Sequence, residues 1–355
     1  MTKAKGKKKI TDTKQFKSAL FFIAVIALSV AYYFLSPYFL SEKPCYNGEF
    51  PIINQSKIVS DLKVVFIDVG QGDAILLKTP SNETILIDAG LEEEYSDVDL
   101  VKYLKNFGVK KIDYAIITHP DADHTGGFIS VFDKFKVKFV FRPYVRSDNK
   151  LTDRLKSRFN PQTTTFCDTD IYANLLLSIN SERSNWVYID KDTDLIFDYG
   201  DGKTLKLDFL TPTADLSELN YTDLNDYSPL IKISYAGKSF MLTGDATKTV
   251  EEEALAFYPH YLLACDVLKV AHHGSDTSTS YSFVKAVSPS YAVISCGEGN
   301  IYKHPKSSVL TTLLAANAKL FRTDLQGSVT FTVNSEGDLS VSTEKIYEGS
   351  LGAGY

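Results

Sequence analysis

Residues 118–127, THPDADHTGG, place two imidazoles and two carboxylates within six positions, directly after the apolar run DYAII. The four side chains are those of His119, Asp121, Asp123 and His124. Groups of this kind, held close together, desolvate or repel one another unless a cation lies among them. Imidazole and carboxylate ligands without thiolate suit zinc, manganese or iron. The chain must therefore fold so that this loop meets further ligands around a metal.

Reactive side chains also follow three other strand-like runs. Asp88 lies at the end of the β-rich segment 83–89, and Asp245 lies at the end of a predicted hairpin over 230–246. The pair His272 and His273 follows a predicted buried strand. Each has a structural interpretation when taken alone, because Asp often shapes turns and a His pair is often a satisfied part of a core. Their repeated position after strands favours a shared site.

The spacing within the loop predicts two metal ions. In an extended loop, His119 and Asp121 point to one position, and Asp123 and His124 point to a neighbouring one. We expect Asp245 to bridge the two ions. One of His272 or His273 is expected to complete the shell of the second ion.

The order of predicted elements indicates a layered α/β sandwich. Strand-like segments at 63–69, 73–79 and 83–89 form a meander, and helical spacing follows at 97–108. A buried strand then leads into the ligand loop, and a helix follows the loop. Residues 169–181 are predicted to form a helix within an insertion. Sheets alternating with helices, with polar clusters at strand ends, are typical of layered α/β folds.

An apolar run near the start of the chain predicts a membrane anchor. Residues 18–36 carry no charge, and as a helix they would be roughly 28 Å long, close to the thickness of a bilayer core. This run is too long for a cleaved signal peptide. Seven lysines precede it, which places the N-terminus in the cytoplasm and the rest outside the cell membrane. We predict a basic cytoplasmic tail at 1–17, a single-pass signal anchor at 18–40, a linker at 41–60, a folded domain at 61–345 and a tail at 346–355.

Charge and cysteine content exclude some classes of protein. Residues 1–17 carry a net charge of +6, and the remaining 31 basic and 43 acidic residues give −12. Such an acidic body is unlike a general nucleic-acid binder, because affinity for phosphates rests on Lys and Arg. The four cysteines lack CxxC spacing, so they indicate neither a zinc knuckle nor a disulfide framework.

The segment THPDADH resembles the HxHxDH signature of the metallo-β-lactamase superfamily, with Asp121 at the second His position. Further segments resemble, in order, the extracytoplasmic hydrolase domain of ComEC-type competence proteins, which act in DNA uptake. They are FIDVGQGDAILL (66–77), LIDAG (86–90), MLTGDA (241–246), LKVAHHGS (268–275), GEGNIYKHP (297–305) and FRTDLQGSVTFT (321–332). This resemblance implies a four-layer αβ/βα metallo-β-lactamase sandwich over 61–345, here preceded by one transmembrane helix.

The resemblance also implies a function. We expect a membrane-anchored, metal-dependent hydrolase, a phosphodiesterase or nuclease related to DNA uptake, which uses two divalent ions (Zn or Mn) and a metal-activated hydroxide. Asp88 is expected to orient a ligand, and the non-ligating member of the His272/His273 pair, or else His304, to protonate the leaving group. Lys269 and Ser275 are expected to hold substrate oxygens. The expected catalytic set is Asp123, Asp245, His304 and Lys269.

Two departures from the family pattern matter. No His lies between His124 and His260, so the first ion would hold only His119, Asp121 and Asp245. This oxygen-rich shell favours manganese. ComEC-type proteins carry a channel of many helices, whereas this chain offers one anchor. If it takes part in DNA uptake, we expect a separate DNA-channel protein as its partner.

Other interpretations stay open. The charge of −12 favours a small or cell-wall phosphoester as substrate, and a non-catalytic anchored binding module is a third alternative. A basic groove leading to the metals would favour nucleic acid, and a closed pocket would favour a small ester. Asp68 and Asp73 of DVGQGD are interpreted as residues that shape a tight turn. The candidates for the basic groove are Arg142, Arg146, Lys150, Arg154, Lys156 and Arg158.

Overall fold

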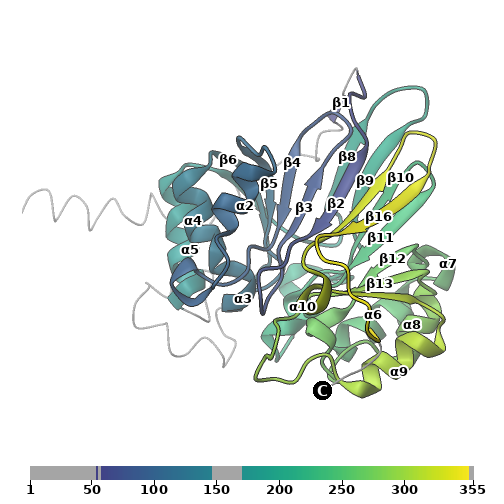
Figure 1. The fold of residues 1–355 in the computed structure, drawn as a ribbon. Helices are drawn as coiled ribbons and strands as arrows, with labels where there is room; N and C mark the ends of the chain where they lie inside the picture. The colour runs from purple at the N-terminus through teal and green to yellow at the C-terminus, as the bar shows by residue number, and fades with distance from the viewer. Residues whose placement is uncertain (1–52, 55–56, 146–169, 352–355) are drawn as a thin grey trace, which may run out of the picture.

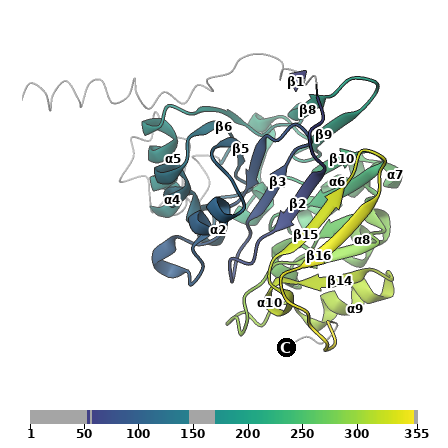
Figure 2. The same ribbon diagram turned by 45° about the horizontal axis from the view of Figure 1, so that its top comes forward.

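The computed structural model describes residues 53–54, 57–145 and 170–351, in which two eight-stranded mixed sheets lie face to face (Figure 1). The first sheet has the strand order β1-β8-β9-β10-β11-β12-β13-β14, and the second has the order β16-β15-β2-β3-β4-β5-β6-β7. Figure 2 shows β15 and β16 beside β2.

The bounds of the strands follow the chain. The first sheet contains β1 (Ile53–Asn54), β8 (Asp194–Asp198), β9 (Thr204–Phe209), β10 (Ile231–Tyr235), β11 (Lys238–Leu242), β12 (Val267–Lys269), β13 (Tyr291–Ile294) and β14 (Lys319–Arg322). The second contains β2 (Leu62–Phe66), β3 (Ile75–Lys78), β4 (Thr84–Ile87), β5 (Ile112–Ile116), β6 (Val137–Arg142), β7 (Asn185–Tyr188), β15 (Val329–Val333) and β16 (Leu339–Thr343).

Helices cover the outer faces of both sheets (Figure 1). The second sheet is covered by α2 (Leu100–Asn106), α4 (Gly127–Lys134) and α5 (Asp170–Ser181). The first sheet is covered by α6 (Lys248–Phe257), α8 (Tyr281–Val287) and α9 (Ser307–Ala315). Together they give the four layers of an αβ/βα sandwich, as the sequence predicts.

Three apolar clusters hold these layers together. Between the sheets, the ring of Phe331 on β15 packs edge-on against Phe66 of β2 and Phe240 of β11, with ring centroids 6.1 and 5.9 Å apart. Phe128 of α4 is buried on the outer side of the second sheet, and Phe283 of α8 is buried on the outer side of the first. Burial of such aromatic side chains is the main source of stability in a core of this kind.

The helix predicted at 169–181 is present as α5, but it does not belong to an insertion. It connects β6 and β7, which pair directly in parallel. Tyr172 and Leu175 of α5 are buried in the same cluster as the side chains of α4. The helix is therefore part of the outer layer of the sandwich, because two parallel neighbouring strands need such a crossover connection.

The strand directions bring the reactive side chains to one edge. Strands β4, β5 and β6 run parallel, and β11 to β14 form a second parallel set. Carboxyl ends of parallel strands share an edge, where α/β sheets commonly bind ligands. Asp88 follows β4, Asp245 follows β11, and His273 follows β12. Strand β3 is antiparallel to β4, so Asp73, which precedes it, reaches the same edge.

The predicted tail at 1–17 and the anchor at 18–40 lie outside the described residues, as does most of the linker. Within the part of the chain that is described, no helix is long and apolar enough to cross a membrane. The domain boundaries and the cellular location therefore stay predictions. Cys265 and Cys296 are free and buried, whereas Cys45 and Cys167 fall outside the described ranges.

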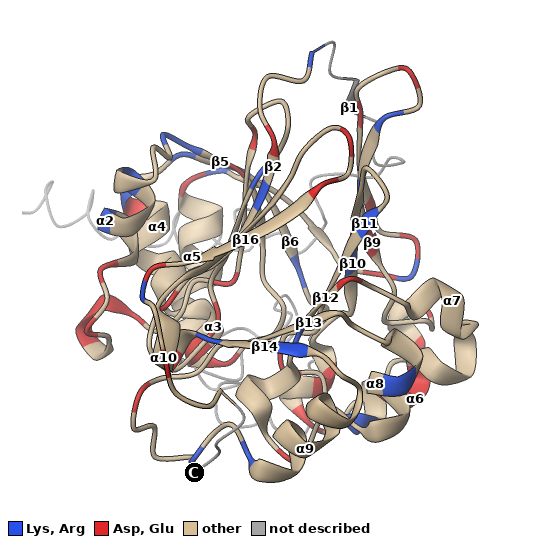
Figure 3. Cartoon of the chain, turned by 45° about the vertical axis from the view of Figure 1, so that its right-hand side comes forward, with Lys and Arg blue, Asp and Glu red and all other residues tan. Residues whose placement is uncertain are grey.

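Charged side chains of both signs are interspersed over the strands and helices (Figure 3). Acidic positions gather around the short 3-10 helix η2 (Glu93–Tyr95), which Asp97 and Asp99 follow in the sequence. Asp97 of this acidic segment lines a cavity together with the loop at residues 68–71 and with Gly297, Glu298 and Asn300.

Candidate metal centre

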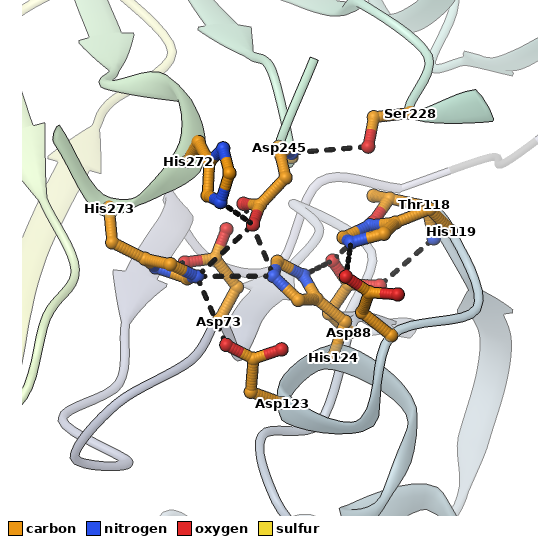
Figure 4. A network of polar contacts seen from close by, with 12 residues as sticks. Asp73, Asp88, Thr118, His119, Asp123, His124, Ser228, Asp245, His272 and His273 are labelled. Atoms are coloured by element: carbon orange, nitrogen blue, oxygen red, sulfur yellow. Dashed lines mark hydrogen bonds and ion pairs between the residues drawn. The ribbon is translucent and has the colours of Figure 1, made fainter. Parts of the chain in front are cut away.

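Four buried side chains converge where the carboxyl ends of the two sheets meet (Figure 4). Asp73, His124, Asp245 and His273 each offer one ligand atom, and these atoms all lie within 4.8 Å of one another. The four come from separate segments of the chain. This spacing is compatible with a shared cation.

The hydrogen bonds that His124 and His273 make through Nδ1 direct both Nε2 atoms towards the centre of the cluster, where each could bind a metal ion. Nδ1 of His273 lies 2.9 Å from the backbone oxygen of Ser295, which only accepts, so this Nδ1 is the donor. Nδ1 of His124 lies 2.8 Å from Oδ2 of Asp88 and donates to that carboxylate. The two Nε2 atoms lie 3.3 Å apart.

Asp245 lies between these two imidazoles. Its Oδ1 is 3.2 Å from Nε2 of His124, and its Oδ2 is 3.3 Å from Nε2 of His273. Buried acceptors that face one another need a cation among them. Burial by itself lowers the pKa of His124, but the carboxylates of Asp245 and Asp88 raise it well above its ordinary value. The cluster therefore attracts positive charge, which fits a divalent metal.

His119 presents a third imidazole in the same way. The hydroxyl of Thr118 donates to Oδ2 of Asp88 at 2.7 Å, so it accepts from Nδ1 of His119 at 3.0 Å. Nε2 of His119 is buried and has no hydrogen-bond partner among the described residues. The His119 and His124 rings are 4.2 Å apart. Asp88 thus orients both imidazoles, one directly and one through Thr118.

The ligand loop is not extended as the spacing argument assumed. Asp121 is instead the N-cap of a helical turn, α3 (Ala122–Thr125), and its side chain is 37% exposed. Oδ2 of Asp121 lies 3.6 Å from Nε2 of His119, so this pair still shares a position. The sequence argument paired Asp123 with His124, but Oδ2 of Asp123 also lies 3.3 Å from Nε2 of His273. Side-chain directions in this segment therefore follow a helical turn and do not alternate as they would in an extended loop.

Asp73 and Lys269 form a buried ion pair that sequence reasoning missed. Nζ of Lys269 lies 2.8 Å from Oδ2 of Asp73, and neither side chain is exposed beyond 1%. Oδ1 of Asp73 is 3.5 Å from Nδ1 of His273. Burial raises the pKa of Asp73, but Lys269, His273 and His124 together outweigh burial and the pKa is lowered. Asp73 is therefore more than a turn residue, and Lys269 holds it rather than a substrate oxygen. A lysine inside an apolar strand was the available signal.

A close backbone contact brings Asp73 to the cluster. The backbone N–H of Asp73 donates to the carbonyl oxygen of Asp123 at 3.1 Å. A side chain at Gly72 would place its Cβ 2.2 Å from that same oxygen, and Gly72 has a φ of +132°. Only glycine fits there. The DVGQGD loop consequently packs directly beneath the turn that carries Asp123.

Both members of the His272/His273 pair face Asp245. Nε2 of His272 lies 3.7 Å from Oδ2 of Asp245, and its Nδ1 lies 2.9 Å from Oγ1 of Thr277. His272 is 24% exposed and His273 is buried. Their φ angles of 49° and 55° place both in the left-handed region, where strain often accompanies functional positions. The backbone turn aims two successive imidazoles at one carboxylate.

His304 and Ser275 are the two remaining site candidates, expected to donate a proton and to contact substrate respectively. The His304 ring lies 5.9 Å from that of His272, and burial together with the charges of His273 and His272 lowers the pKa of His304 to about 4. It is neutral at pH 7, which makes it a weak proton donor. Ser275 is buried, and its Oγ accepts from the backbone N–H of Thr277 and faces Oγ1 of Thr277. These contacts give Ser275 a part in shaping the loop, and its expected contact with substrate stays a prediction.

Arg142, one of the six residues predicted to line a basic groove, does not lie on the surface. Arg142 is buried, with its guanidinium 4.1 Å from the ring centroid of Trp186 and 4.6 Å from that of Tyr188. It also donates to the hydroxyl of Tyr188 at 3.2 Å. Arg142 therefore stabilises the β6–β7 packing rather than lining a surface. The other five groove residues, at 146–158, lie outside the described ranges.

Comparisons with known proteins agree with this geometry. The family model described as metallo-beta-lactamase superfamily matches residues 67–157. ComE operon protein 3 of Bacillus subtilis is 28% identical over 300 residues, which cover 79% of this chain and 34% of that protein. Competence protein ComA of Neisseria gonorrhoeae is 29% identical over 289 residues, covering 81% and 35% respectively.

Recombination protein 2 of Haemophilus influenzae is 26% identical over 266 residues, covering 74% of this chain and 28% of that protein. The chain thus spans about a third of the length of the curated relatives it matches. The matches to the competence proteins confirm the resemblance drawn from the sequence motifs. Residues 67–157 are similar to the metallo-beta-lactamase superfamily, and about four fifths of the chain is similar in sequence to the competence proteins.

Proposed function

We propose that this protein is a membrane-anchored, metal-dependent phosphodiesterase with DNA as its leading substrate. The observation that carries the proposal is the buried set of Nε2 and carboxylate oxygens around Asp245, in which His124 and His273 already donate elsewhere through Nδ1. Divalent ions bound there would lower the pKa of a coordinated water towards 7 and polarise a phosphoryl oxygen.

The protein's own residues divide this work. Asp245 faces an imidazole with each carboxylate oxygen, which suits a bridging ligand. Asp88 and Thr118 fix the ring orientations of His119 and His124. Such outer partners commonly set the affinity of a metal site.

Exposure indicates the side from which a substrate reaches the cluster. Asp121, Asp123 and His272 have side chains that are 37%, 26% and 24% exposed, whereas His119, His124 and Asp245 are buried. We infer that a phosphodiester approaches past the exposed three. His272 can then hold a proton or a phosphoryl oxygen, because its Nδ1 is oriented by Thr277.

Support for DNA comes from the relatives, whose names refer to competence and recombination. The apolar segment 18–40 and its lysine-rich flank support an anchor with the catalytic domain outside the cell. A separate channel protein would then be a partner in DNA uptake. These steps go beyond the domain itself and are part of the proposal.

A small or cell-wall phosphoester is the alternative substrate. The net charge of −12 after residue 17 favours it, and so does the burial of Arg142, since that residue no longer offers a basic surface. A phosphate strand needs cations along its path, whereas a small ester needs only the centre itself.

The full chain in detergent, loaded with Mn²⁺ or Zn²⁺, tests these options. Single-stranded DNA, double-stranded DNA and bis-p-nitrophenyl phosphate are assayed side by side, with Asp245→Ala as the control. We expect DNA cleavage that disappears in Asp245→Ala. Turnover of the small diester alone would favour the alternative, and DNA binding without any turnover would favour a binding module.

A further inference from the structure

The loop at residues 297–305 is held in one conformation beside the metal centre. Nδ2 of Asn300 donates to the carbonyl oxygens of Gly297 and His304 at 2.9 and 2.7 Å. Oδ1 of Asn300 accepts from the backbone N–H of His304 at 2.9 Å. One amide side chain therefore closes the loop from within, and the residues between its ends are presented without depending on a partner molecule.

A row of rings runs from this loop to the cluster. The ring of Tyr302 stacks on His304 with centroids 5.8 Å apart and an interplanar angle of 25°. His304 lies edge-on to His272 at 5.9 Å, and Nε2 of His272 is 3.7 Å from Asp245. Tyr302 is the outer member of the row, and it is 55% exposed. One face of the phenol ring thus has a partner, and much of the rest meets solvent.

The same loop carries positive charge beside this ring. Nζ of Lys306 donates to the carbonyl oxygen of Tyr302 at 2.7 Å, which holds the ammonium close to the loop with further N–H groups to offer. Lys303 is exposed and has a φ of +56°. Nδ1 of His304 is buried and has no hydrogen-bond partner within the described part of the chain. The aromatic ring of Tyr302 and the ammonium groups of Lys303 and Lys306 therefore belong to the same short segment of the chain.

The first half of the loop borders a different environment. Gly297, Glu298 and Asn300 line a cavity of about 530 Å³ whose other charged lining residues are Asp68, Asp97, Asp324 and Lys345. Asp324 is neutralised by Arg322, which leaves three carboxylates against one ammonium, and this balance repels a phosphate. A polyanionic strand is consequently directed away from this cavity and towards the Tyr302 side.

We propose that Tyr302 is a stacking surface for the nucleobase next to the scissile phosphodiester, and that Lys306 and Lys303 hold the neighbouring phosphate. The inference rests on the proposed phosphodiesterase function and narrows its substrate class to a base-carrying strand. Base stacking on an aromatic side chain tolerates any sequence, because every base has a π face. Arrays of exposed aromatic and basic residues are typical of single-strand binding.

The test compares two DNA strands of twelve nucleotides with the same sugar-phosphate backbone. One is oligothymidine, and the other is its abasic analogue. The full chain, loaded with Mn²⁺, is assayed as wild type, Tyr302→Ala, Tyr302→Phe and Tyr261→Ala. Tyr261 is a matched control, since it is 74% exposed on α7 (His260–Leu263), before β12 and away from the carboxyl edge. The readout is the ratio of kcat/KM between the strands, because a folding or metal-loading defect lowers both equally.

We expect wild type to prefer the thymidine strand by about five-fold or more, which corresponds to the lower end of measured stacking energies. Tyr302→Ala loses this preference, whereas Tyr302→Phe and Tyr261→Ala keep it. A preference unchanged in Tyr302→Ala, with both strands still cleaved, overturns the inference and leaves the phosphodiesterase standing. If the protein hydrolyses bis-p-nitrophenyl phosphate and neither strand, the inference that its substrate carries bases is wrong. Wild type that hydrolyses none of the three substrates overturns the proposed function itself.

Discussion

Nε2 of His124 and Nε2 of His273 lie 3.3 Å apart, although the other nitrogen of each ring already donates a hydrogen bond. Both Nε2 atoms also face the carboxylate of Asp245; burial lowers the pKa of each imidazole, but the nearby carboxylates, Asp245 foremost, raise it well above its ordinary value, so the metal-free cluster holds protons where a metal ion would bind. The fold accepts this arrangement because the backbone turns at Asp88 and at His272 and His273 impose it. A divalent cation would take the place of these protons, and this determines how the protein should respond to metals.

Metal binding should stabilise the fold through this cluster. At a free Mn²⁺ or Zn²⁺ concentration of one hundred times Kd, the free energy of unfolding should rise by about 2.7 kcal/mol, because the ion binds only the folded state. Urea denaturation in EDTA and in metal buffer measures the difference. Asp245→Ala should show no such gain, and an equal gain in that variant would place the metal elsewhere.

Asp88→Asn should weaken metal binding by about 10–100-fold, because Asp88 orients His124 directly and His119 through Thr118. Asparagine tolerates the φ of 55° at this position, so the backbone is preserved. Thr118→Val disturbs only the His119 branch and should have a smaller effect. Isothermal titration with Mn²⁺ distinguishes the two. Equal losses in both variants would contradict the branched arrangement.

The Lys269–Asp73 pair should behave as a coupled unit. Lys269→Met leaves a buried carboxylate without its partner, and Asp73→Asn leaves a buried ammonium, so each should cost about 3–5 kcal/mol of stability. The double variant should cost clearly less than the sum of the two. Urea unfolding in EDTA measures all four proteins without interference from metal. Additive effects would show that the pair contributes no mutual stabilisation.

His304 should make the metal-free protein sensitive to acid. Burial and the nearby His273 and His272 lower the pKa of His304 from 6.5 to about 4, so the unfolded state takes up the proton first as the pH falls. The free energy of unfolding should fall by about 1.4 kcal/mol per pH unit through this group between pH 6.5 and 4. His304→Gln should have a correspondingly shallower pH profile in EDTA. Parallel profiles would disprove the shift.

The local pattern of the sequence was sufficient for the elements and for many of the side chains that meet at the candidate site. Short apolar, β-rich runs predict β4, β5 and β11, and polar residues directly after them predict Asp88, His119 and Asp245 as one group. Periodicity also predicts α5. These features depend on neighbours within a few positions, which a sequence displays directly.

Other features depend on which strands become neighbours in space. Asp73 joins the cluster because β3 runs antiparallel to β4 and because Gly72 lets its loop pass under Asp123. Lys269 is paired because the edge of the first sheet meets that loop, about 200 residues away along the chain. Arg142 is buried for the same kind of reason, between side chains of a strand that follows a long connection.

The sequence by itself therefore determined which residue types stand at the ends of strands, since hydrophobic periodicity and turn chemistry are local. Only the tertiary structure decided which of those residues form ion pairs and which way each imidazole points. These choices follow from long-range packing, hydrogen-bond geometry and the cost of burying an unpaired ion, and none of the three can be read from residues adjacent in sequence.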